Sequence, residues 1–272
     1  IRKLFKGVVT TIAGESPGFA DGPGADARFY HPRGVALDAQ GRLLVADVMN
    51  NRIRRVTSEG ETTTIGGADG PRIEGMLHSI LVAKDGVIMV SVLHDPHRIC
   101  TLSADGTLTT LAGSAEYGFV DGRGEAARFS DPMGMAEGPD GRIYVADGSN
   151  NSIRRVDRQG NVTTVAGGGP VPMGEGQTID GDLAVARFVL PTSVAVASDG
   201  TIYVGQPRGE IDPGERAGGC VRMTCEGMVT TLYRCDSEVN GLCLDEPSGI
   251  LYISINCGIL AITVPTPAER KE

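Results

Sequence analysis

Short runs of alternating apolar residues, each bounded by polar turn residues, follow one another through the first well-defined block of the chain. Four such runs lie at residues 34–37, 43–46, 53–56 and 62–65, and they are rich in valine, leucine, isoleucine and threonine. A period of two indicates strands, because successive side chains of a strand point to opposite faces of the sheet. The pattern predicts a four-stranded antiparallel unit, whose strands we call a, b, c and d.

The turns between these strands place glycine where a tight hairpin needs a positive φ. Gln40-Gly41 separates strands a and b of the first block, and Glu59-Gly60 separates strands c and d. Glycine lacks a Cβ and adopts this conformation without steric cost. The corresponding a–b turns of other blocks are Asp85-Gly86, Asp140-Gly141 and Asp199-Gly200, and the c–d turns are Asp105-Gly106, Gln159-Gly160 and Glu226-Gly227.

The block repeats along the chain. Residues 132–167 closely repeat residues 32–65, and weaker copies of strand a begin at Ser79, Ser193 and Gly241. Successive copies start 45 to 59 residues apart. A period of about 40–50 residues with four strands in each copy is typical of propeller blades. The predicted fold class is therefore all-β, a β-propeller of four-stranded antiparallel blades with five repeats visible.

The two ends of the chain match different strands of the repeat. Residues 1–4 and 8–14 match strands c and d, whereas residues 241–264 supply strands a, b and c. The N-terminal strand d is expected to complete the last blade and close the ring, which hides the sheet edges. A six-bladed parent that is incomplete here is the alternative, and it accounts for the surplus strand at residues 1–4. Residues 1–264 are expected to form a single propeller domain, with a polar C-terminal tail at residues 265–272.

Two tetrapeptides between strands b and c resemble a known repeat. The tetrapeptides are Asn50-Asn51-Arg52-Ile53 and Asn150-Asn151-Ser152-Ile153, each in a segment that contains Val-Ala-Asp just before it, and they resemble the NHL repeat. With the weaker copies included, the resemblance covers nearly the whole chain. The variant with an Asp-Gly loop before strand a is similar to NHL repeats found beside thioredoxin-like domains and in large multidomain proteins. The resemblance implies an interaction platform in most members, RNA binding through a basic face in some, and metal-dependent lyase or hydrolase activity in a minority. The fold alone does not choose between these functions.

A second motif joins strand d to the next strand a. It reads Asp21-Gly22, Ala27-Arg28-Phe29 and Pro32, and it recurs from Asp121 and from Asp180 with the same spacing between aspartate and phenylalanine. We interpret the motif as architectural. The phenylalanine fills a gap between blades, the aspartate bonds its own loop, and the proline fixes the start of the inner strand.

The d–a and b–c loops share one face of a propeller, and in this sequence both kinds of loop carry carboxylates. Clustered carboxylates attract a basic partner or hold a hard cation. We therefore predict a binding face for a protein or a basic peptide on these loops, where the b–c insertion at residues 205–219 also projects. The candidate residues are Asp21, Asp26, Asp47, Asp95, Asp121, Glu125, Asp147, Asp180 and Asp182.

The charge of the chain bears on its partners. The 272 residues carry a formal net charge of −9, which repels phosphate backbones and anionic membranes. The pairs Arg54-Arg55 and Arg154-Arg155 lie within strand c, so their stems are expected to pack on the sheet while their heads reach the acidic rim. No apolar run is long enough to predict a membrane span. Nucleic acid and membranes are therefore not expected as partners.

The cysteines and histidines match no known metal or nucleophile motif. His94 and His97 lie close together, but His97 takes the loop position of Asn51, so we interpret it as a loop residue. Cys243 and Cys220 replace packing residues and are expected to be buried. Cys225 and Cys235 flank one strand at opposite ends, too far apart for a disulfide, which favours reduced thiols and a cytoplasmic setting.

The function predicted from these observations is that of a non-enzymatic binding or scaffold propeller, one domain of a larger protein, without catalytic residues, metal or cofactor. The alternative is a metal-dependent lyase or hydrolase that uses the central channel. Metal analysis of the purified protein distinguishes the two, because a lyase or hydrolase of this kind needs converging histidine and carboxylate ligands.

Overall fold

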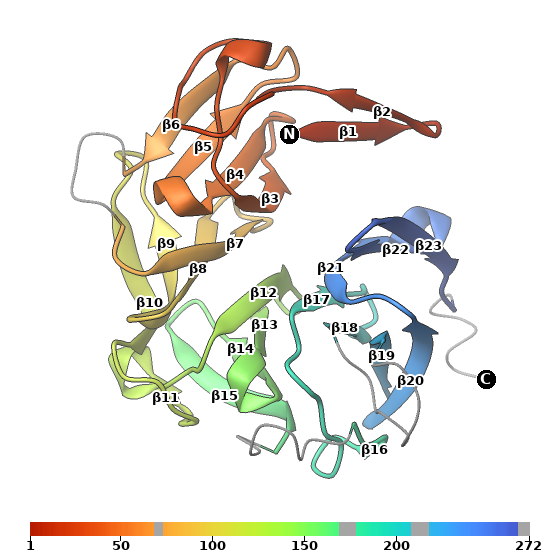
Figure 1. Cartoon of the computed structure of the whole chain (residues 1–272). Coiled ribbons are helices and arrows are strands. Elements are labelled where there is room, and N and C mark those ends of the chain that lie inside the picture. Colours follow the sequence, from red (N-terminus) through yellow and green to blue (C-terminus); the bar gives the residue numbers. More distant parts are fainter. Residues whose placement is uncertain (68–72, 169–177, 208–217, 266–272) are drawn as a thin grey trace. The chain divides into compact units, whose positions relative to one another are not determined.

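The computed structural model describes residues 1–67, 73–168, 178–207 and 218–265, and the chain divides into two compact units, Ile1–Thr110 and Leu111–Glu272. Antiparallel sheets make up both units (Figure 1). The chain is an all-β protein built from five blades of a β-propeller, as the alternating pattern predicts, and an N-terminal hairpin accompanies the blades. The polar tail expected at residues 265–272 lies, except for its first residue, outside the described residues.

The first unit contains the N-terminal hairpin, one four-stranded sheet and most of a second, whose outer strand ends in the second unit. The hairpin pairs β1 (Arg2–Phe5) with β2 (Val8–Thr11), and η1 (Gly24–Asp26) lies in the following loop. The first blade contains β3 (Pro32–Leu37), β4 (Leu43–Asp47), η2 (Val48–Asn50), β5 (Arg52–Val56) and β6 (Thr62–Gly66). The second blade contains β7 (Met76–Val82), β8 (Ile88–Leu93), β9 (His97–Leu102) and β10 (Leu108–Ser114).

The second unit contains two five-stranded sheets and one three-stranded sheet. The third blade is built from β11 (Gly122–Arg123), η3 (Gly124–Ala126), β12 (Pro132–Glu137), β13 (Ile143–Asp147), η4 (Gly148–Asn150), β14 (Ser152–Val156) and β15 (Asn161–Gly167). The fourth contains β16 (Gly181–Asp182), β17 (Ser193–Val196), β18 (Ile202–Gln206), β19 (Gly219–Cys225) and β20 (Met228–Cys235). The last contains β21 (Val239–Asp245), η5 (Glu246–Ser248), β22 (Ile250–Ile255) and β23 (Gly258–Thr263).

The predicted turns are confirmed by the backbone. Gly41 and Gly60, in the a–b and c–d turns of the first blade, have φ values of 74° and 90°, and the equivalent glycines of the next three blades are also positive. Gly34 has a different role, because a Cβ built on it lies 2.8 Å from the Cα of Ser79 in the neighbouring blade. The inner strands β3 and β7 thus approach too closely for any larger residue.

The core of each unit lies between neighbouring blades. In the first unit, Leu44, Ala46 and Ile53 of the first blade pack against Ile80 and Val90 of the second. Within each unit, neighbouring blades bury their facing apolar side chains against one another, and this burial stabilises the pair. The motif phenylalanines confirm their predicted role, since Phe29, Phe129 and Phe188 are all buried.

The last sheet differs from the prediction in its number of strands. It has three strands, while the strand expected to complete it, β2, is paired with β1. Closure of the ring by this strand depends on the placement of the two units and stays a prediction.

Cys243 of β21 is exposed rather than buried, since it lies on the face of this sheet opposite the buried Leu251 and Ile253. Cys220 is buried, as expected.

Candidate functional site

A buried arginine ties each Asp-Gly loop to its blade. In the first blade Arg54 of β5 has no exposed surface, although it lies in a strand expected to show its charged head. Its guanidinium donates hydrogen bonds to Asp21 at 2.6 Å and Asp47 at 2.7 Å, and to the carbonyl oxygens of Ala20 and Arg28. The prediction that this head reaches the rim is wrong, because two carboxylates and two carbonyls neutralise and satisfy it inside the blade.

The loop aspartate is bound to the outer strands rather than to its own loop. Asp21 accepts hydrogen bonds from the backbone N–H and the hydroxyl of Thr64, at 2.9 and 3.0 Å. The pairing of β5 with β6 shifts between Ile53 and Arg54, and this bulge presents the Thr64 N–H to the carboxylate. The expected bond of the aspartate within its own loop is therefore corrected to an anchor on strands c and d.

The same arrangement recurs in two blades of the second unit. Arg154 contacts Asp121 and Asp147, and Arg222 contacts Asp180. Thr164 and Thr231 take the place of Thr64, each after an equivalent bulge. Aromatic rings cover the guanidinium groups, for example Phe19 and Phe29 at 4.9 Å from Arg54.

The third of these networks has lost one carboxylate. Gln206 ends β18 at the position where Asp147 ends β13, and its amide donates to the Val189 carbonyl at 3.1 Å. Burial lowers the pKa of Arg222, although Asp180 opposes this effect. Burial raises the pKa of Asp147 to about 6, although the hydrogen bonds from Asn150 and Arg154 oppose this effect.

The structure separates the nine predicted site residues into three groups. Asp47 and Asp147 are fully buried, so no partner can touch them. The side chains of Asp21, Asp121 and Asp180 are about half exposed, at 45%, 48% and 49%, and each is paired with its arginine. The remaining residues, Asp26, Asp95, Glu125 and Asp182, are exposed.

The exposed carboxylates do not share one face with the b–c loops. Each of the three Asp-Gly loops runs along the outer strand to the c–d turn before it returns, so Gly24 bonds Gly60 and Asp182 pairs with Met228. Asp26, Glu125 and Asp182 therefore lie beside the c–d turns, at the end of the blade opposite Asp95. The expected single acidic face is corrected in this respect. Much of the insertion at residues 205–219 lies outside the described residues.

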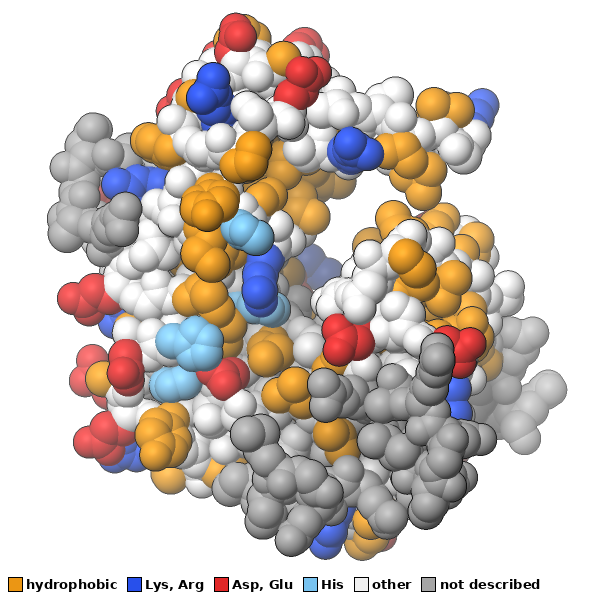
Figure 2. Space-filling view, in the orientation of Figure 1, with side chains coloured by type: hydrophobic (Ala, Val, Ile, Leu, Met, Phe, Trp, Pro, Cys, Tyr) orange, Lys and Arg blue, Asp and Glu red, His pale blue; other side chains and the backbone are white. Residues whose placement is uncertain are grey.

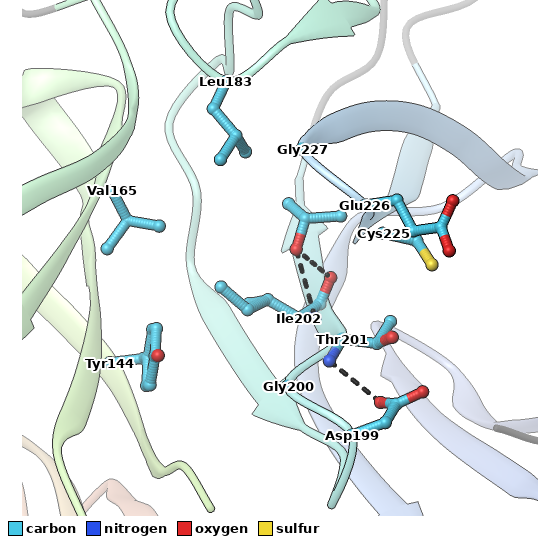
Figure 3. Close-up of a pocket in the computed structure, with 11 residues that line it drawn as sticks. Tyr144, Val165, Leu183, Asp199, Gly200, Thr201, Ile202, Cys225, Glu226 and Gly227 are labelled. Atoms are coloured by element: carbon cyan, nitrogen blue, oxygen red, sulfur yellow. Dashed lines mark hydrogen bonds between the residues drawn. The ribbon is translucent and has the colours of Figure 1, made fainter. Parts of the chain in front are cut away.

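A crevice opens between the third and fourth blades, within the second unit. Its volume is about 270 Å³, and its apolar wall consists of Tyr144, Val165, Leu183 and Ile202 (Figure 3). The a–b turn of the fourth blade, Asp199–Thr201, and its c–d turn, Glu226-Gly227, form the opposite side. Thr224 links the strands beneath them by accepting a hydrogen bond from the Ile202 N–H at 3.1 Å.

The crevice thus combines an apolar wall with two carboxylates from adjacent turns. Asp199 is held by the Thr201 N–H at 3.0 Å, and the Leu183 N–H donates to the Gly227 carbonyl at 3.1 Å. The first bond holds the shape of the a–b turn, and the second ties the end of the d–a loop to the c–d turn. The sequence signal for this site was the Asp-Gly and Glu-Gly turns, which we interpreted as turns alone. A groove of this kind suits an aliphatic side chain that ends in a positive charge.

Metal ligands do not converge among the described residues. Within the described ranges, no group of three or more His, Cys, Asp or Glu side chains is placed to hold a metal ion. His97 is the buried first residue of β9 rather than a loop residue, and His94 is exposed beside it. No helix in the described part of the chain is long and apolar enough to cross a membrane.

Comparison with known proteins agrees with the fold. Residues 29–56 match the family model of the NHL repeat. NHL repeat-containing protein 2 of Bos taurus is 26% identical over 297 residues, which cover 90% of the chain and 40% of that relative. The chloroplastic protein SUPPRESSOR OF QUENCHING 1 of Arabidopsis thaliana is 36% identical over 96 residues, which cover 34% of the chain and 9% of that protein.

A solved structure with a similar fold supports the architecture. The gluconolactonase of Xanthomonas campestris matches with a TM-score of 0.62 and 19% identity, over 88% of this chain and 74% of that structure. At this identity the likeness shows the fold alone. The repeated antiparallel sheets define the class as a β-propeller, and the repeat match together with these relatives supports an NHL-type β-propeller. The chain spans less than half of either curated relative.

Proposed function

We propose that this chain is a non-enzymatic binding platform and that it holds a basic protein segment in the crevice between the third and fourth blades. The observation that carries the proposal is the crevice itself, which is lined by apolar side chains and by the turns that carry Asp199 and Glu226. A lysine or arginine stem packs on Tyr144 and Ile202 while its charged head meets the carboxylates.

The repeated polar residues support this proposal. The arginines and aspartates that recur in three blades are engaged with one another and with carbonyl groups inside the blades. Their chemistry holds the loops in place, and the crevice carboxylates are a separate set. The wider loop-face site, with Asp26, Asp95, Glu125 and Asp182 as its exposed members, stays a prediction.

Binding of a labelled library of short peptides, with lysine or arginine flanked by apolar residues, tests the proposal by fluorescence anisotropy. The double variant Asp199→Asn, Glu226→Gln is expected to weaken the selected peptides by about tenfold, and salt should weaken them further. Asp140→Asn is the matched control, because Asp140 has the same a–b turn position in the third blade and does not line the crevice.

Equal affinities for the wild type and the double variant would contradict the proposed site. A separate triple variant, Asp26→Asn, Glu125→Gln and Asp182→Asn, then tests whether the d–a loops bind the peptide instead. Weaker peptide binding by this variant would place the site on those loops. The metal-dependent alternative is checked by elemental analysis of the same protein, where stoichiometric zinc or calcium would favour it.

A further inference from the structure

The c–d turn beside the crevice is one residue shorter than the c–d turn of the third blade. Residues 157–161 join the paired strands β14 and β15, whereas the equivalent residues of the fourth blade are 225–228. Glu226 and Gly227 form its tip, and both have positive φ, at 52° and 80°, as a tight two-residue turn requires. The first blade has the longer form, at residues 57–61. The shorter turn is therefore a local departure from the repeat.

The longer turns fill the space against the preceding strand d. A Cβ built on Gly60 lies 2.4 Å from the carbonyl oxygen of Ile12, and a Cβ built on Gly160 lies 2.3 Å from the carbonyl oxygen of Leu111. A Cβ built on Gly227, by contrast, has no atom within 4 Å. The shorter turn thus leaves open the space that the crevice occupies.

A backbone acceptor lies where the longer turn would cover it. Val165 lines the crevice and takes the position of Leu111 in its own blade. It is the bulged residue of β15, so it has no partner across the pair with β14. Because Gly227 does not approach its carbonyl oxygen, this oxygen can accept a hydrogen bond from a ligand.

The crevice presents the kinds of group with which this protein holds its own arginines. The guanidinium of Arg222 donates to the Asp180 carboxylate and to the carbonyl oxygens of Ile179 and Arg187. The Phe188 ring lies 5.5 Å from it. The crevice likewise combines turn carboxylates, a bulge carbonyl and a tyrosine ring. A guanidinium carries five donors in one plane and satisfies several acceptors at once, whereas an ammonium is a compact, strongly hydrated charge.

Charge alone does not mark this place, because Figure 2 shows Asp and Glu side chains at several separate points of the visible surface. We propose that the crevice selects arginine over lysine in the bound segment, an inference that rests on the function proposed above. The guanidinium stacks on Tyr144 and donates to the Val165 carbonyl and to the carboxylates of Asp199 and Glu226. The shorter turn makes the room for this group.

Peptides that differ at one residue test the selectivity. A peptide selected from the library is made with arginine, lysine or citrulline at the basic position, and anisotropy gives the three affinities. The arginine peptide should bind about tenfold more tightly than the other two, since lysine lacks the planar donors and citrulline lacks the charge. Tyr144→Leu introduces the residue of the first blade, Leu44, at this position. It should weaken the arginine peptide by about threefold and leave the lysine peptide unchanged.

A longer turn tests the origin of the site. Replacing residues 225–228 by the sequence of residues 57–61 adds one residue and retains a Glu-Gly pair. This variant should keep its thermal stability but bind the arginine peptide more than about thirtyfold more weakly, because the turn fills the crevice. Met228→Glu is the matched control. It introduces the last residue of the replacement without lengthening the turn, so affinity should change by less than about threefold.

The outcomes separate this inference from the proposed function. Equal affinities for the arginine and lysine peptides, or full binding by a folded long-turn variant, would overturn the selectivity while the binding function stands. Absence of binding by every peptide would overturn both. The peptide comparison uses the wild-type protein, so it decides the question even if the long-turn variant does not fold.

Discussion

The first two blades have the same strand order but differ chemically at the centre of strand c. In the first blade Arg54, opposite Val45, is buried between Asp21 and Asp47. In the second blade Cys100, opposite Val90, holds the equivalent position, and Val92 replaces the aspartate at the end of strand b. Both Cys100 and Val92 are fully buried.

The comparison shows that a propeller blade accepts either an ion network or an uncharged set at this position. A buried charge is tolerated only with its partners, whereas an apolar replacement of the whole set is often neutral or stabilising. The polar version has an additional effect, since it attaches the Asp-Gly loop to strands c and d. A mixed set, with a charge and no partner, is expected to be the costly case.

The largest expected effect comes from making such a mixed set in the second blade. Cys100→Arg buries a guanidinium in a blade where Val92 takes the place of the partner aspartate, and it should lower the free energy of unfolding by more than about 4 kcal/mol. Adding Val92→Asp should restore part of this loss. Urea denaturation measures both, with Thr109→Arg on the exposed side of β10 as the control for an added charge. A stable Cys100→Arg protein would show that water reaches this position.

A smaller effect is expected from removing one carboxylate of a complete network. Asp147→Ala removes the fully buried carboxylate that accepts hydrogen bonds from Arg154 and Asn150 and should cost about 3–4 kcal/mol. Gln206→Ala, at the same position of the fourth blade, removes the hydrogen bond from the Gln206 side-chain amide to the Val189 carbonyl. This loss should cost about 1 kcal/mol. Similar losses in the two variants would mean that the charge at this position is unimportant.

Substitution of the half-exposed aspartates tests the difference in stability between the networks of the third and fourth blades. Asp121→Ala should cost about 1–2 kcal/mol, because Asp147 still neutralises Arg154. Asp180→Ala should cost about 1 kcal/mol more, since Gln206 gives the fourth blade no second carboxylate at that position. Thermal and urea unfolding of the two variants give this difference directly. A larger loss in Asp121→Ala than in Asp180→Ala would contradict this. It would show that Gln206 stabilises the charge of Arg222 better than Asp147 stabilises the charge of Arg154.

The smallest effect is a dependence on acid pH. Partial burial raises the pKa of Asp121, but hydrogen bonds from the Thr164 N–H and from Arg154 outweigh it and hold the pKa below its ordinary value. A lowered pKa in the folded state stabilises the protein above the ordinary pKa, and this stability is lost as pH falls through the folded value. Between about pH 4 and pH 2, the wild type should lose on the order of 0.5 kcal/mol more than Asp121→Asn. Parallel pH profiles of the two proteins would contradict this.

Much of the architecture could be read from the sequence because propeller strands are short and locally specified. The predicted strands at residues 43–46 and 53–56 differ from β4 and β5 by a single residue at one end. Alternation fixes which side chains share a face, and the Asp-Gly or Glu-Gly pairs fix the turns. The phenylalanine of the loop motif was also identified correctly as a packing residue.

The candidate site was less predictable because the repeated charges are paired across long distances in the sequence. Asp21 lies 33 residues before Arg54 and 43 before Thr64, and neither separation reveals a contact. Exposed carboxylates and buried ones have the same local pattern, so Asp47 and Asp26 were placed on one face. The crevice depends on the packing of two blades, for which no local motif exists.

The sequence by itself determined the blades, since a period-two pattern with glycine turns has few other solutions in water. It also determined which loops repeat. Tertiary structure alone decided which charges are neutralised and which are presented, because that depends on how the d–a loop turns back along its outer strand. Tertiary structure likewise decided that Cys243 is exposed although its counterpart Ala195 in the fourth blade is buried. Burial at this position requires a neighbouring sheet, which no residue of the same strand can supply.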